Sequence, residues 1–353
     1  MVADALRGGK VAFSMKQRVN NDLSSLRDPV TKEPLKLEGD RLVAPSGDSY
    51  PIVNGIPRFV SSEDYSADFG AQWKRFPKTQ LDSFTGFPIS HDRLARCFQG
   101  ELPEVSGRRV LEAGSGAGRF TEVLLGQGAI LDSFDMSTAV EANALNNGDK
   151  PFTLAQADIR RMPFEPNSYD YVVCLGVIQH TPDSEESIAK LWEMVRPGGR
   201  LVIDHYDWNR WRLPWPIGDV SKVYRQYMLR LPRAKRWAAV KRHVDFWFPL
   251  YWRYRDNRWA MRILSRLGGI NFYYGGLPLR TREEFYEWSL LDTHDAMTDF
   301  YKRYRTAGSI RRTLEQLGAT DIQVTKGSLG IEGGNGIEAS CRKPLASSTS
   351  PLN

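Results

Sequence analysis

The residues most capable of chemistry form a glycine-rich turn, LEAGSGAG, at positions 111–118. The apolar run RVLEA (109–113) leads into this turn, and a helical pattern, GRFTEVLLGQG, follows it. Glycine is needed where a ligand approaches the backbone too closely for a Cβ atom, or where φ is positive. The pattern therefore predicts a ligand site at a strand-to-helix junction, although an ordinary structural turn shares it.

Three acidic residues lie near the turn at spacings typical of nucleotide sites. Asp135 ends the next apolar run, about twenty residues on, where a carboxylate can accept both hydroxyls of a ribose. Asp158 ends the third run, where it can meet an adenine edge, and Glu112 lies beside the turn itself. Because ligands of open α/β sheets bind at the carboxyl ends of the strands, we expect these carboxylates to converge there.

The charge beside the turn indicates which nucleotide-like ligand it takes. A dinucleotide fingerprint reads GxGxxG and cradles a pyrophosphate, whereas this turn reads GxGxG and is followed by Arg119. Glu112, immediately before the glycines, would repel a pyrophosphate but suits a ligand with an ammonium group. S-adenosylmethionine carries an ammonium and a sulfonium, so the pattern favours it over NAD.

Alternating apolar runs and helical patterns must position these residues. Four runs that are nearly all apolar, with helices between them, predict a parallel sheet buried on both faces. After about residue 206 the alternation stops, and it resumes with a final helix and two runs that suit a hairpin on the sheet edge. After the first run, 109–113, the further runs are 129–135, 152–158, 169–177 and 200–206, the last after an RPGG turn (196–199). The helices are 137–147, 184–195 and 309–319, and the hairpin runs are DIQVTK and GIEASCRK.

Residues 108–206 resemble a class I S-adenosylmethionine-dependent methyltransferase of the broad small-molecule and ubiquinone-biosynthesis type. The matching segments are VLEAGSGAGRF (110–120), SFDMS (133–137), ADIRRMPF (157–164), YDYVVCLGVIQHTPD (169–183) and VRPGGRLVI (195–203). Five motifs in order make the resemblance specific for fold and cofactor. It implies an α/β fold with a Rossmann-like seven-stranded sheet, formed by residues 108–206 and 306–343.

The resemblance also implies how S-adenosylmethionine would be held. Glu112 and Gly114 would hold its methionine end, Asp135 its ribose, and Asp158 with Ile159 its adenine. Many relatives have Asp at position 112, and Glu changes the reach but not the sign of the charge. Leu175 and Gly176 would line the pocket, and the implied cofactor set also includes Ser115, Gly116, Gly118 and Met136.

Residues 61–107 are expected to form an N-terminal helical cap. Phe69, Gln72 and Trp73 fall at helical spacing before the core, where related enzymes fold a helix over the cofactor. Packing of the fold alone would explain the same spacing, and both interpretations stay open.

Residues 25–60 have short apolar runs interrupted by Pro, Gly and Asp, which predicts a small β meander. Without a flexible linker after it, this unit should pack on the main domain. Through SYPIVNGIPRF and DPVTKEPL it is similar to small zinc-ribbon proteins related to tRNA-methyltransferase activators. Those often carry a CPxC pair where this chain has Asp28 and Thr31, and a cysteine near Ala44, so we expect a metal-free unit.

The composition limits the class of protein to which the chain can belong and the kinds of site that it can hold. With 41% hydrophobic and 25% charged residues it is typical of a globular protein, and no run approaches the roughly 20 apolar residues of a spanning helix. The three cysteines are far apart, which excludes a disulfide scaffold and a cysteine-rich zinc site. The N-terminus has no apolar run of signal-peptide length, so we expect a cytoplasmic protein. Residues 1–24 and 344–353 are expected to be a disordered leader and tail.

Histidines supply the candidates for a catalytic base. A hydroxyl acceptor must lose its proton, and His180 follows the fourth run, at the rim of the expected pocket. His205 ends the fifth run beside Tyr206, and His294 lies next to Asp295. Each histidine also has a purely structural interpretation. Tyr206 and Asp295 are the expected substrate contacts.

A basic, aromatic insert at 207–305 separates the two parts of the predicted core. Residues 209–268 contain 15 Lys or Arg, 3 Asp or Glu and six of the ten tryptophans, although the whole chain carries only +6. The insert suits a helical lid over the substrate. It also suits an interfacial element on an anionic membrane, with a lipid or lipid-linked acceptor, or less readily an RNA-binding surface.

The sequence thus predicts a methyltransferase acting on oxygen or nitrogen of a small-molecule or glycan- or lipid-linked acceptor. An RNA methyltransferase is the alternative enzyme, and a non-catalytic cofactor-binding subunit that docks through its insert is the alternative of another class. The presence of Glu112, Asp135 and Asp158 together weighs against the non-catalytic subunit, because a subunit without activity need not keep all three.

Overall fold

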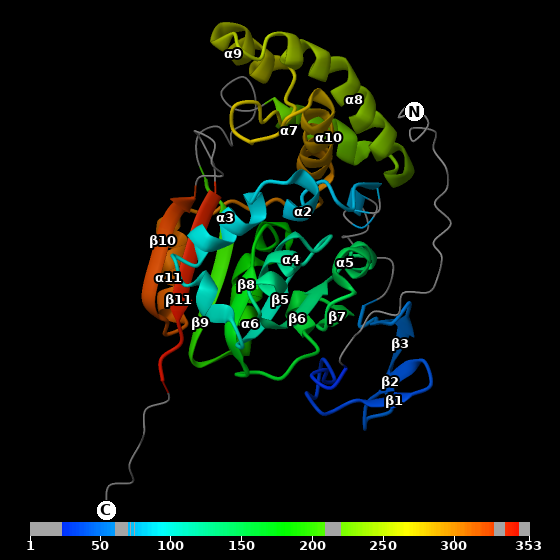
Figure 1. Ribbon diagram of the computed structural model, residues 1–353, viewed down its shortest axis with the longest axis vertical. Helices are drawn as coiled ribbons and strands as arrows, with labels where there is room; N and C mark the ends of the chain where they lie inside the picture. Colours follow the sequence, from blue (N-terminus) through cyan, green and yellow to red (C-terminus); the bar gives the residue numbers. More distant parts are fainter. Residues whose placement is uncertain are drawn as a thin grey trace, which may run out of the picture.

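The computed structural model describes residues 23–60, 70, 72–73, 75–208, 220–327 and 336–345. Most of the predicted leader, Phe69, and the tail beyond residue 345 lie outside these residues. Figure 1 shows a central sheet flanked by helices, a small blue β unit at one side, and a yellow-green helical insert above the sheet.

The central sheet has seven strands in the order β10-β11-β9-β8-β5-β6-β7. β9, β8, β5, β6 and β7 pair in parallel, while β11 pairs antiparallel with both β9 and β10. This topology confirms the predicted Rossmann-like sheet and its terminal hairpin. The strands are β5 (Arg109–Ala113), β6 (Ile130–Asp135), β7 (Thr153–Gln156), β8 (Tyr169–Cys174), β9 (Val195–Tyr206), β10 (Thr320–Gly327) and β11 (Gly336–Arg342).

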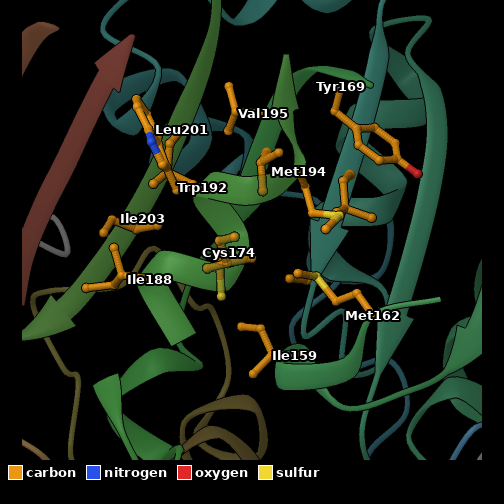
Figure 2. Close-up of a cluster of buried hydrophobic side chains, with 14 of the residues drawn as sticks. Ile159, Met162, Tyr169, Cys174, Ile188, Trp192, Met194, Val195, Leu201 and Ile203 are labelled. Atoms are coloured by element: carbon orange, nitrogen blue, oxygen red, sulfur yellow. The ribbon is translucent and has the colours of Figure 1, made fainter. Parts of the chain in front are cut away.

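Both faces of the sheet are buried because successive side chains of each strand point to opposite sides. Val110 and Val173 join one cluster, which includes residues of α3, α4 and α5. Leu111 and Val172 join a second, which includes residues of α6 and α11 and part of which Figure 2 shows. The flanking helices are α2 (Asp82–Thr85), α3 (Ile89–Cys97), η1 (Leu102–Val105), α4 (Arg119–Gly126), α5 (Val140–Asn147), η2 (Ile159–Arg161), η3 (Ile178–His180), α6 (Ser184–Met194) and α11 (Ala307–Gln316).

The predicted turn at 196–199 is instead part of β9. The register of β9 against β8 shifts between Tyr169 and Tyr171, and Gly198 has a positive φ of 79°. A Cβ atom at Gly199 would lie 2.9 Å from the carbonyl oxygens of Tyr169 and Asp170. The two glycines therefore allow an irregular strand to pass close to its neighbour, which a Pro-Gly-Gly sequence alone does not reveal.

The N-terminal unit is the predicted β meander, and it packs on the main domain as expected. Phe59 donates a backbone hydrogen bond to the Gln156 carbonyl of β7 (2.8 Å), and Arg58 contacts the Gln156 side chain (3.0 Å). Asp28 accepts from the amides of Val30 and Thr31 at 2.8 Å each. This buried carboxylate organises the loop. The strands are β1 (Lys36–Glu38), β2 (Arg41–Val43), β3 (Ser49–Val53) and β4 (Ile56–Pro57).

The insert is helical and has a hydrophobic core of its own, which includes Val240, Val244, Phe248 and Met297. No helix in the described part of the chain is long and apolar enough to cross a membrane. The helices are α7 (Ser221–Arg230), α8 (Arg233–Arg253), α9 (Arg258–Leu267) and α10 (Arg282–Thr298).

Candidate active site

A cavity of about 250 Å³ lies at the carboxyl ends of the parallel strands, beneath the cap and the insert. The strand ends supply its floor, the segment before α3 supplies one wall, and α10 supplies another. Of the residues proposed from the sequence, thirteen line it: Gln72, Trp73, Gly114, Ser115, Gly116, Asp135, Met136, Ile159, Leu175, Gly176, His180, Tyr206 and Asp295. Glu112, Gly118, Asp158, His205 and His294 are not among its lining residues.

The glycines of the turn have separate tasks. A Cβ atom at Gly114 would lie 2.2 Å from the Val177 side chain, and φ there is 79°. Gly118, with φ of 90°, allows α4 to approach Asn143 of α5, which a Cβ would meet at 2.3 Å. Gly114 therefore shapes the cavity, whereas Gly118 serves helix packing.

Glu112 lies fully buried beneath the turn. Its Oε2 accepts hydrogen bonds from Thr121 (2.5 Å) and Ser133 (2.8 Å), while Oε1 has no partner among the described residues. Burial raises the pKa of Glu112 to about 7, and the nearby charge of Asp135 adds to the rise. The structure thus places Glu112 under the turn rather than in direct reach of a ligand.

Asp135 reaches the cavity from the end of β6. One carboxylate oxygen accepts from the Gly116 amide (2.9 Å), and the other accepts from the amide and hydroxyl of Ser137 (2.8 and 2.7 Å). These bonds fix the carboxylate at the ligand side of the turn. A carboxylate at the end of this strand stands where a ribose would present its hydroxyls.

The expected adenine end lies beside η2. Ile159 lines the cavity, whereas Asp158 caps η2 by accepting from the Arg160 amide (2.9 Å) and forms an ion pair with the Arg160 guanidinium (2.7 Å). Asp158 therefore has a structural partner already, and the neighbouring Ile159 is the residue that lines the cavity.

Gln72 and Trp73 of the cap both line the cavity, and His294 holds Gln72. Nδ1 of His294 lies 2.7 Å from the amide oxygen of Gln72, so α10 anchors the cap. Burial and the charges of Arg75 and Arg236 lower the pKa of His294 to about 4, so the ring is neutral near pH 7. Trp73 packs over Gly116, where a Cβ atom would lie 3.4 Å from the indole nitrogen.

Arg119 was not proposed from the sequence as a binding residue, yet it lines the cavity. Its guanidinium donates to Ser90 (3.1 Å) and Gln80 (2.8 Å), and no carboxylate among the described residues forms an ion pair with it. Burial lowers its pKa to about 10, which leaves the side chain charged. Its neighbour Arg93 is instead neutralised by an ion pair with Asp204. Arg119 is thus a partly buried cation with capacity for an anionic ligand group, and in the sequence only its position one residue after the last glycine indicates this.

His180 lies at the opposite end of the cavity, beside Asp299, a residue that sequence reasoning missed. Nδ1 of His180 lies 3.2 Å from the Tyr301 carbonyl oxygen and 3.3 Å from Asp299 Oδ2, and Nε2 lies 3.3 Å from the Tyr206 hydroxyl. Burial alone would lower the pKa of His180, but the carboxylates of Asp299 and Asp295 raise it above its usual value. Asp299 itself stays ionised, because Lys302, His180 and Arg225 outweigh its burial and lower its pKa to about 2.

Two carboxylates of α10 line the cavity, Asp295 near His180 and Asp292 near Arg119. Asp295 lines the cavity, and its carboxylate has no hydrogen-bond or ion-pair partner within the described ranges. Burial raises its pKa. Asp292 accepts from Gln80 (3.2 Å), and burial raises its pKa to about 6. These two carboxylates can therefore accept protons or hold a donor group.

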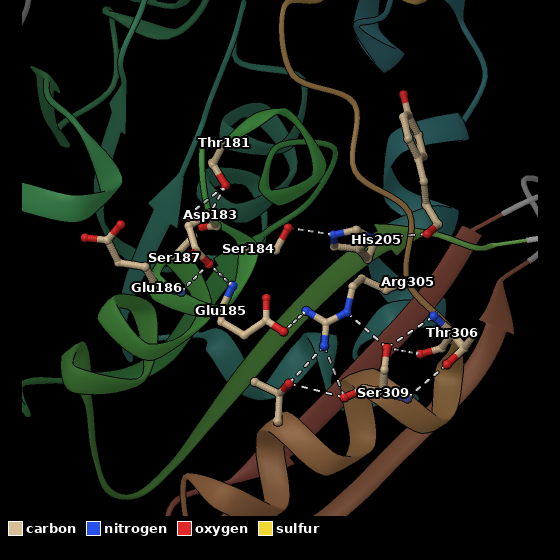
Figure 3. Close-up of polar contacts among 12 residues, drawn as sticks. Thr181, Asp183, Ser184, Glu185, Glu186, Ser187, His205, Arg305, Thr306 and Ser309 are labelled. Carbon is tan, nitrogen blue, oxygen red and sulfur yellow. Dashed lines mark hydrogen bonds and ion pairs between the residues drawn. The ribbon is translucent and has the colours of Figure 1, made fainter. Parts of the chain in front are cut away.

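His205 has a structural task. Figure 3 shows its ring bonded to Ser184 at the start of α6, with Nε2 3.0 Å from the hydroxyl, while Nδ1 lies 3.1 Å from the Tyr206 carbonyl. Burial lowers the pKa of His205. It fastens the end of β9 to α6 rather than facing the cavity. Among the described residues, no group of three or more His, Cys, Asp or Glu side chains could hold a metal ion.

Comparison with known proteins agrees with this arrangement. Residues 111–203 match a family described as a methyltransferase domain. Ubiquinone biosynthesis O-methyltransferases from Saccharophagus degradans and Photorhabdus laumondii are 30% and 28% identical over 113 and 125 residues. These alignments cover 31% and 34% of this chain and 48% and 51% of the relatives, so the chain spans about half the length of the curated relatives it matches.

A solved S-adenosylmethionine-dependent methyltransferase from Mesorhizobium loti aligns with a TM-score of 0.41 and 16% identity, covering 70% of this chain and 96% of that one. The family match covers the glycine turn, Asp135, the end of β8 and most of β9, which are the elements that form the cofactor end of the cavity. Residues 111–203 therefore form a class I S-adenosylmethionine-dependent methyltransferase domain.

Proposed function

We propose that this protein transfers a methyl group from S-adenosylmethionine to an oxygen or nitrogen of a small-molecule or glycan- or lipid-linked acceptor. The observation that carries the proposal is a single cavity that joins the turn and Asp135 at one end with His180 at the other. The names of the curated relatives, ubiquinone biosynthesis O-methyltransferases, support an oxygen acceptor.

The residues at the cofactor end suit the chemical groups of S-adenosylmethionine. Asp135 stands where the ribose hydroxyls would bind, and Arg119, without an ion-pair partner among the described residues, offers a positive charge for the carboxylate of the methionine part. The buried hydroxyl of Ser115, also at the cavity wall, has no partner among the described residues. S-adenosylmethionine supplies, when bound, an electrophilic methyl group on a sulfonium.

At the acceptor end, His180 would act as the general base. Its Nε2 faces the Tyr206 hydroxyl, so an acceptor hydroxyl in that region can give its proton to the ring. The Tyr301 carbonyl holds Nδ1 of the ring, and Asp299 is a positioning residue whose charge beside Nδ1 stabilises the imidazolium that forms. Asp295, unpaired within the described ranges and facing the cavity, would hold a hydroxyl or an ammonium of the acceptor.

Enclosure of the cavity contributes to the reaction as well. Methyl transfer from a sulfonium gains most from holding the reacting atoms in line and excluding water. The cap and α10 cover the strand ends, and the contact between His294 and Gln72 ties these two covers together. The predicted role of the insert as a substrate lid is part of this proposal.

We also propose that the protein works in the cytoplasm, at the inner face of the membrane. Its three cysteines are all free and buried, and free thiols persist in reducing compartments. The basic insert supports a peripheral contact with anionic lipid.

Methyl-labelled S-adenosylmethionine, incubated with the purified chain and separate metabolite, lipid and RNA fractions of cells, tests the proposal. We expect label in the metabolite or lipid fraction, and loss of that label with His180→Gln. Label in RNA alone would replace the proposed acceptor. Binding of the cofactor with no label in any fraction would favour a non-catalytic docking subunit.

A further inference from the structure

The outer face of α9 combines exposed apolar side chains with arginines. Trp259, Ile263 and Leu267 follow one another at intervals of four residues, and 75%, 60% and 48% of their surfaces are exposed. Arg258, Arg262 and Arg266 repeat at the same interval and are exposed too. At 3.6 residues per turn the two rows run side by side, roughly 100° apart around the helix. In Figure 1, α9 lies at the end of the insert farthest from the central sheet.

The exposed apolar row is not needed to hold α9 in place. The helix is attached through the other side: Leu264 is buried in the core of the insert. Its carbonyl accepts from the Tyr251 hydroxyl (2.7 Å), and the Gly268 carbonyl lies 2.7 Å from Nε2 of His243. Asn257 caps the helix by accepting from the amides of Trp259 and Ala260. α9 is therefore a formed helix, and its second apolar face is left to solvent.

The charge around this face is strongly positive. Residues 220–267 contain 13 Lys or Arg against Asp245 and Asp256. Asp245 already forms an ion pair with Lys241 (2.8 Å). A helix that combines an apolar row with an adjacent basic row matches a membrane surface, where the apolar side chains enter the headgroup boundary and the arginines meet anionic headgroups.

We infer that α9 lies in the surface of an anionic lipid membrane, with Trp259, Ile263 and Leu267 inserted and Arg258, Arg262 and Arg266 against the headgroups. The guanidinium of Arg262 lies 5.1 Å from the centre of the Trp259 ring, so the cation and the ring can enter the interface together. This inference does not depend on methyl transfer, since it concerns a surface remote from the cavity.

Two other occupants fit this face less well. A second copy of the chain would bring its own arginine row against this one, and like charges so placed repel. RNA would contact the arginines, but the side chains of Ile263 and Leu267 cannot stack on bases as aromatic rings do. Trp259 alone could stack on a base, whereas lipid accounts for all three apolar side chains of the row.

Flotation of the full-length chain with vesicles tests the inference. Vesicles of phosphatidylcholine with added phosphatidylglycerol should carry the protein, whereas vesicles of phosphatidylcholine alone should carry much less. The double variant Trp259→Ser, Ile263→Ser should lower the partition coefficient about tenfold or more, because burial of these side chains is lost. Replacing the three arginines with Gln should lower it on the order of fivefold per residue and remove its dependence on salt.

Leu145→Ser is the matched control, because Leu145 is 50% exposed on α5, outside the insert. It should float like the wild type, and all variants should bind S-adenosylhomocysteine equally well, which separates this inference from the proposed function. Absence of wild-type protein from the anionic vesicles would overturn the inference, as would an equal loss with the control. The inference would also be overturned if the Trp259 and Ile263 substitutions disrupted an RNA complex or a dimer of the chain but left vesicle binding unchanged.

Discussion

The seven-stranded core and the helical insert contribute different kinds of side chain to one cavity. The core places its residues at strand ends, where backbone bonds fix them: Asp135 accepts from the amides of Gly116 and Ser137. The insert supplies Asp295 near His180 from α10, a helix that follows the core strands by more than a hundred residues in the sequence. The core thus forms the cofactor end, and the insert completes the acceptor end.

The two regions also differ in charge. The insert is basic on its surface, yet the side chains that it turns toward the cavity are carboxylates, with pKa values raised by burial. Its outer arginines and inner carboxylates therefore face different partners. The positive net charge of the insert therefore reflects its outer surface, whereas the chemistry at the cavity depends on the individual carboxylates of α10.

The largest expected effect comes from a substitution of His180, which should impair the acceptor end of the cavity and leave the cofactor end intact. His180→Gln should lower methyl transfer to an oxygen acceptor by about 10²–10⁴-fold, the usual contribution of a positioned base. The affinity for S-adenosylhomocysteine should stay unchanged, because His180 lies at the acceptor end. Initial rates with the labelled acceptor fraction, together with titration calorimetry, measure both quantities. A fall in rate of less than tenfold would assign His180 a structural role.

A smaller effect is expected at the cofactor end from Arg119→Gln. Loss of a charge-assisted hydrogen bond should weaken S-adenosylhomocysteine binding by about 1.5–3 kcal/mol. Methylthioadenosine lacks the carboxylate, so its affinity should change little. Equal losses for both ligands, measured by competition, would show that Arg119 supports the fold of the turn and does not bind the carboxylate.

The smallest expected effect is a shift in pH dependence with Asp299→Asn. Neutral His180 is the active form of the base, so the rate should rise with pH through the pKa of His180, which Asp299 raises. Removing the charge of Asp299 lowers that pKa, and the midpoint of the profile should move to lower pH. An unchanged midpoint, in a variant that still binds S-adenosylhomocysteine, would argue against coupling between Asp299 and His180.

The sequence predicted the core well because local patterns there coincide with tertiary contacts. Apolar runs such as 109–113 and 169–174 are buried on both faces, so their composition reveals both the strand and its parallel neighbours. The glycine turn and Asp135 belong to one strand-turn-helix unit and its neighbouring strand, which places their side chains at the same sheet edge. Thirteen of the residues proposed from the sequence accordingly line the cavity.

Contacts between distant segments could not be predicted in the same way. Asp299 meets His180 only after α10 folds across the strand ends, and Arg119 becomes an uncompensated cation only because the cap buries it. Asp158 stands at the expected position, but the nearby Arg160 takes its carboxylate. His294 stands beside two acidic residues in sequence, yet its ring turns to Gln72 of the cap. Strand position reveals where a residue is, whereas its partners depend on packing.

The most direct test of a cavity with separate cofactor and acceptor ends is calorimetric titration of S-adenosylhomocysteine into the wild type, Asp135→Ala and Asp295→Ala. The wild type and Asp295→Ala should bind with the same affinity, because Asp295 lies at the acceptor end. Asp135→Ala should bind more weakly by about 1–3 kcal/mol, since a buried charge-assisted hydrogen bond is lost. No uptake by the wild type, or equal losses in both variants, would contradict a cofactor end built by the core and an acceptor end completed by the insert.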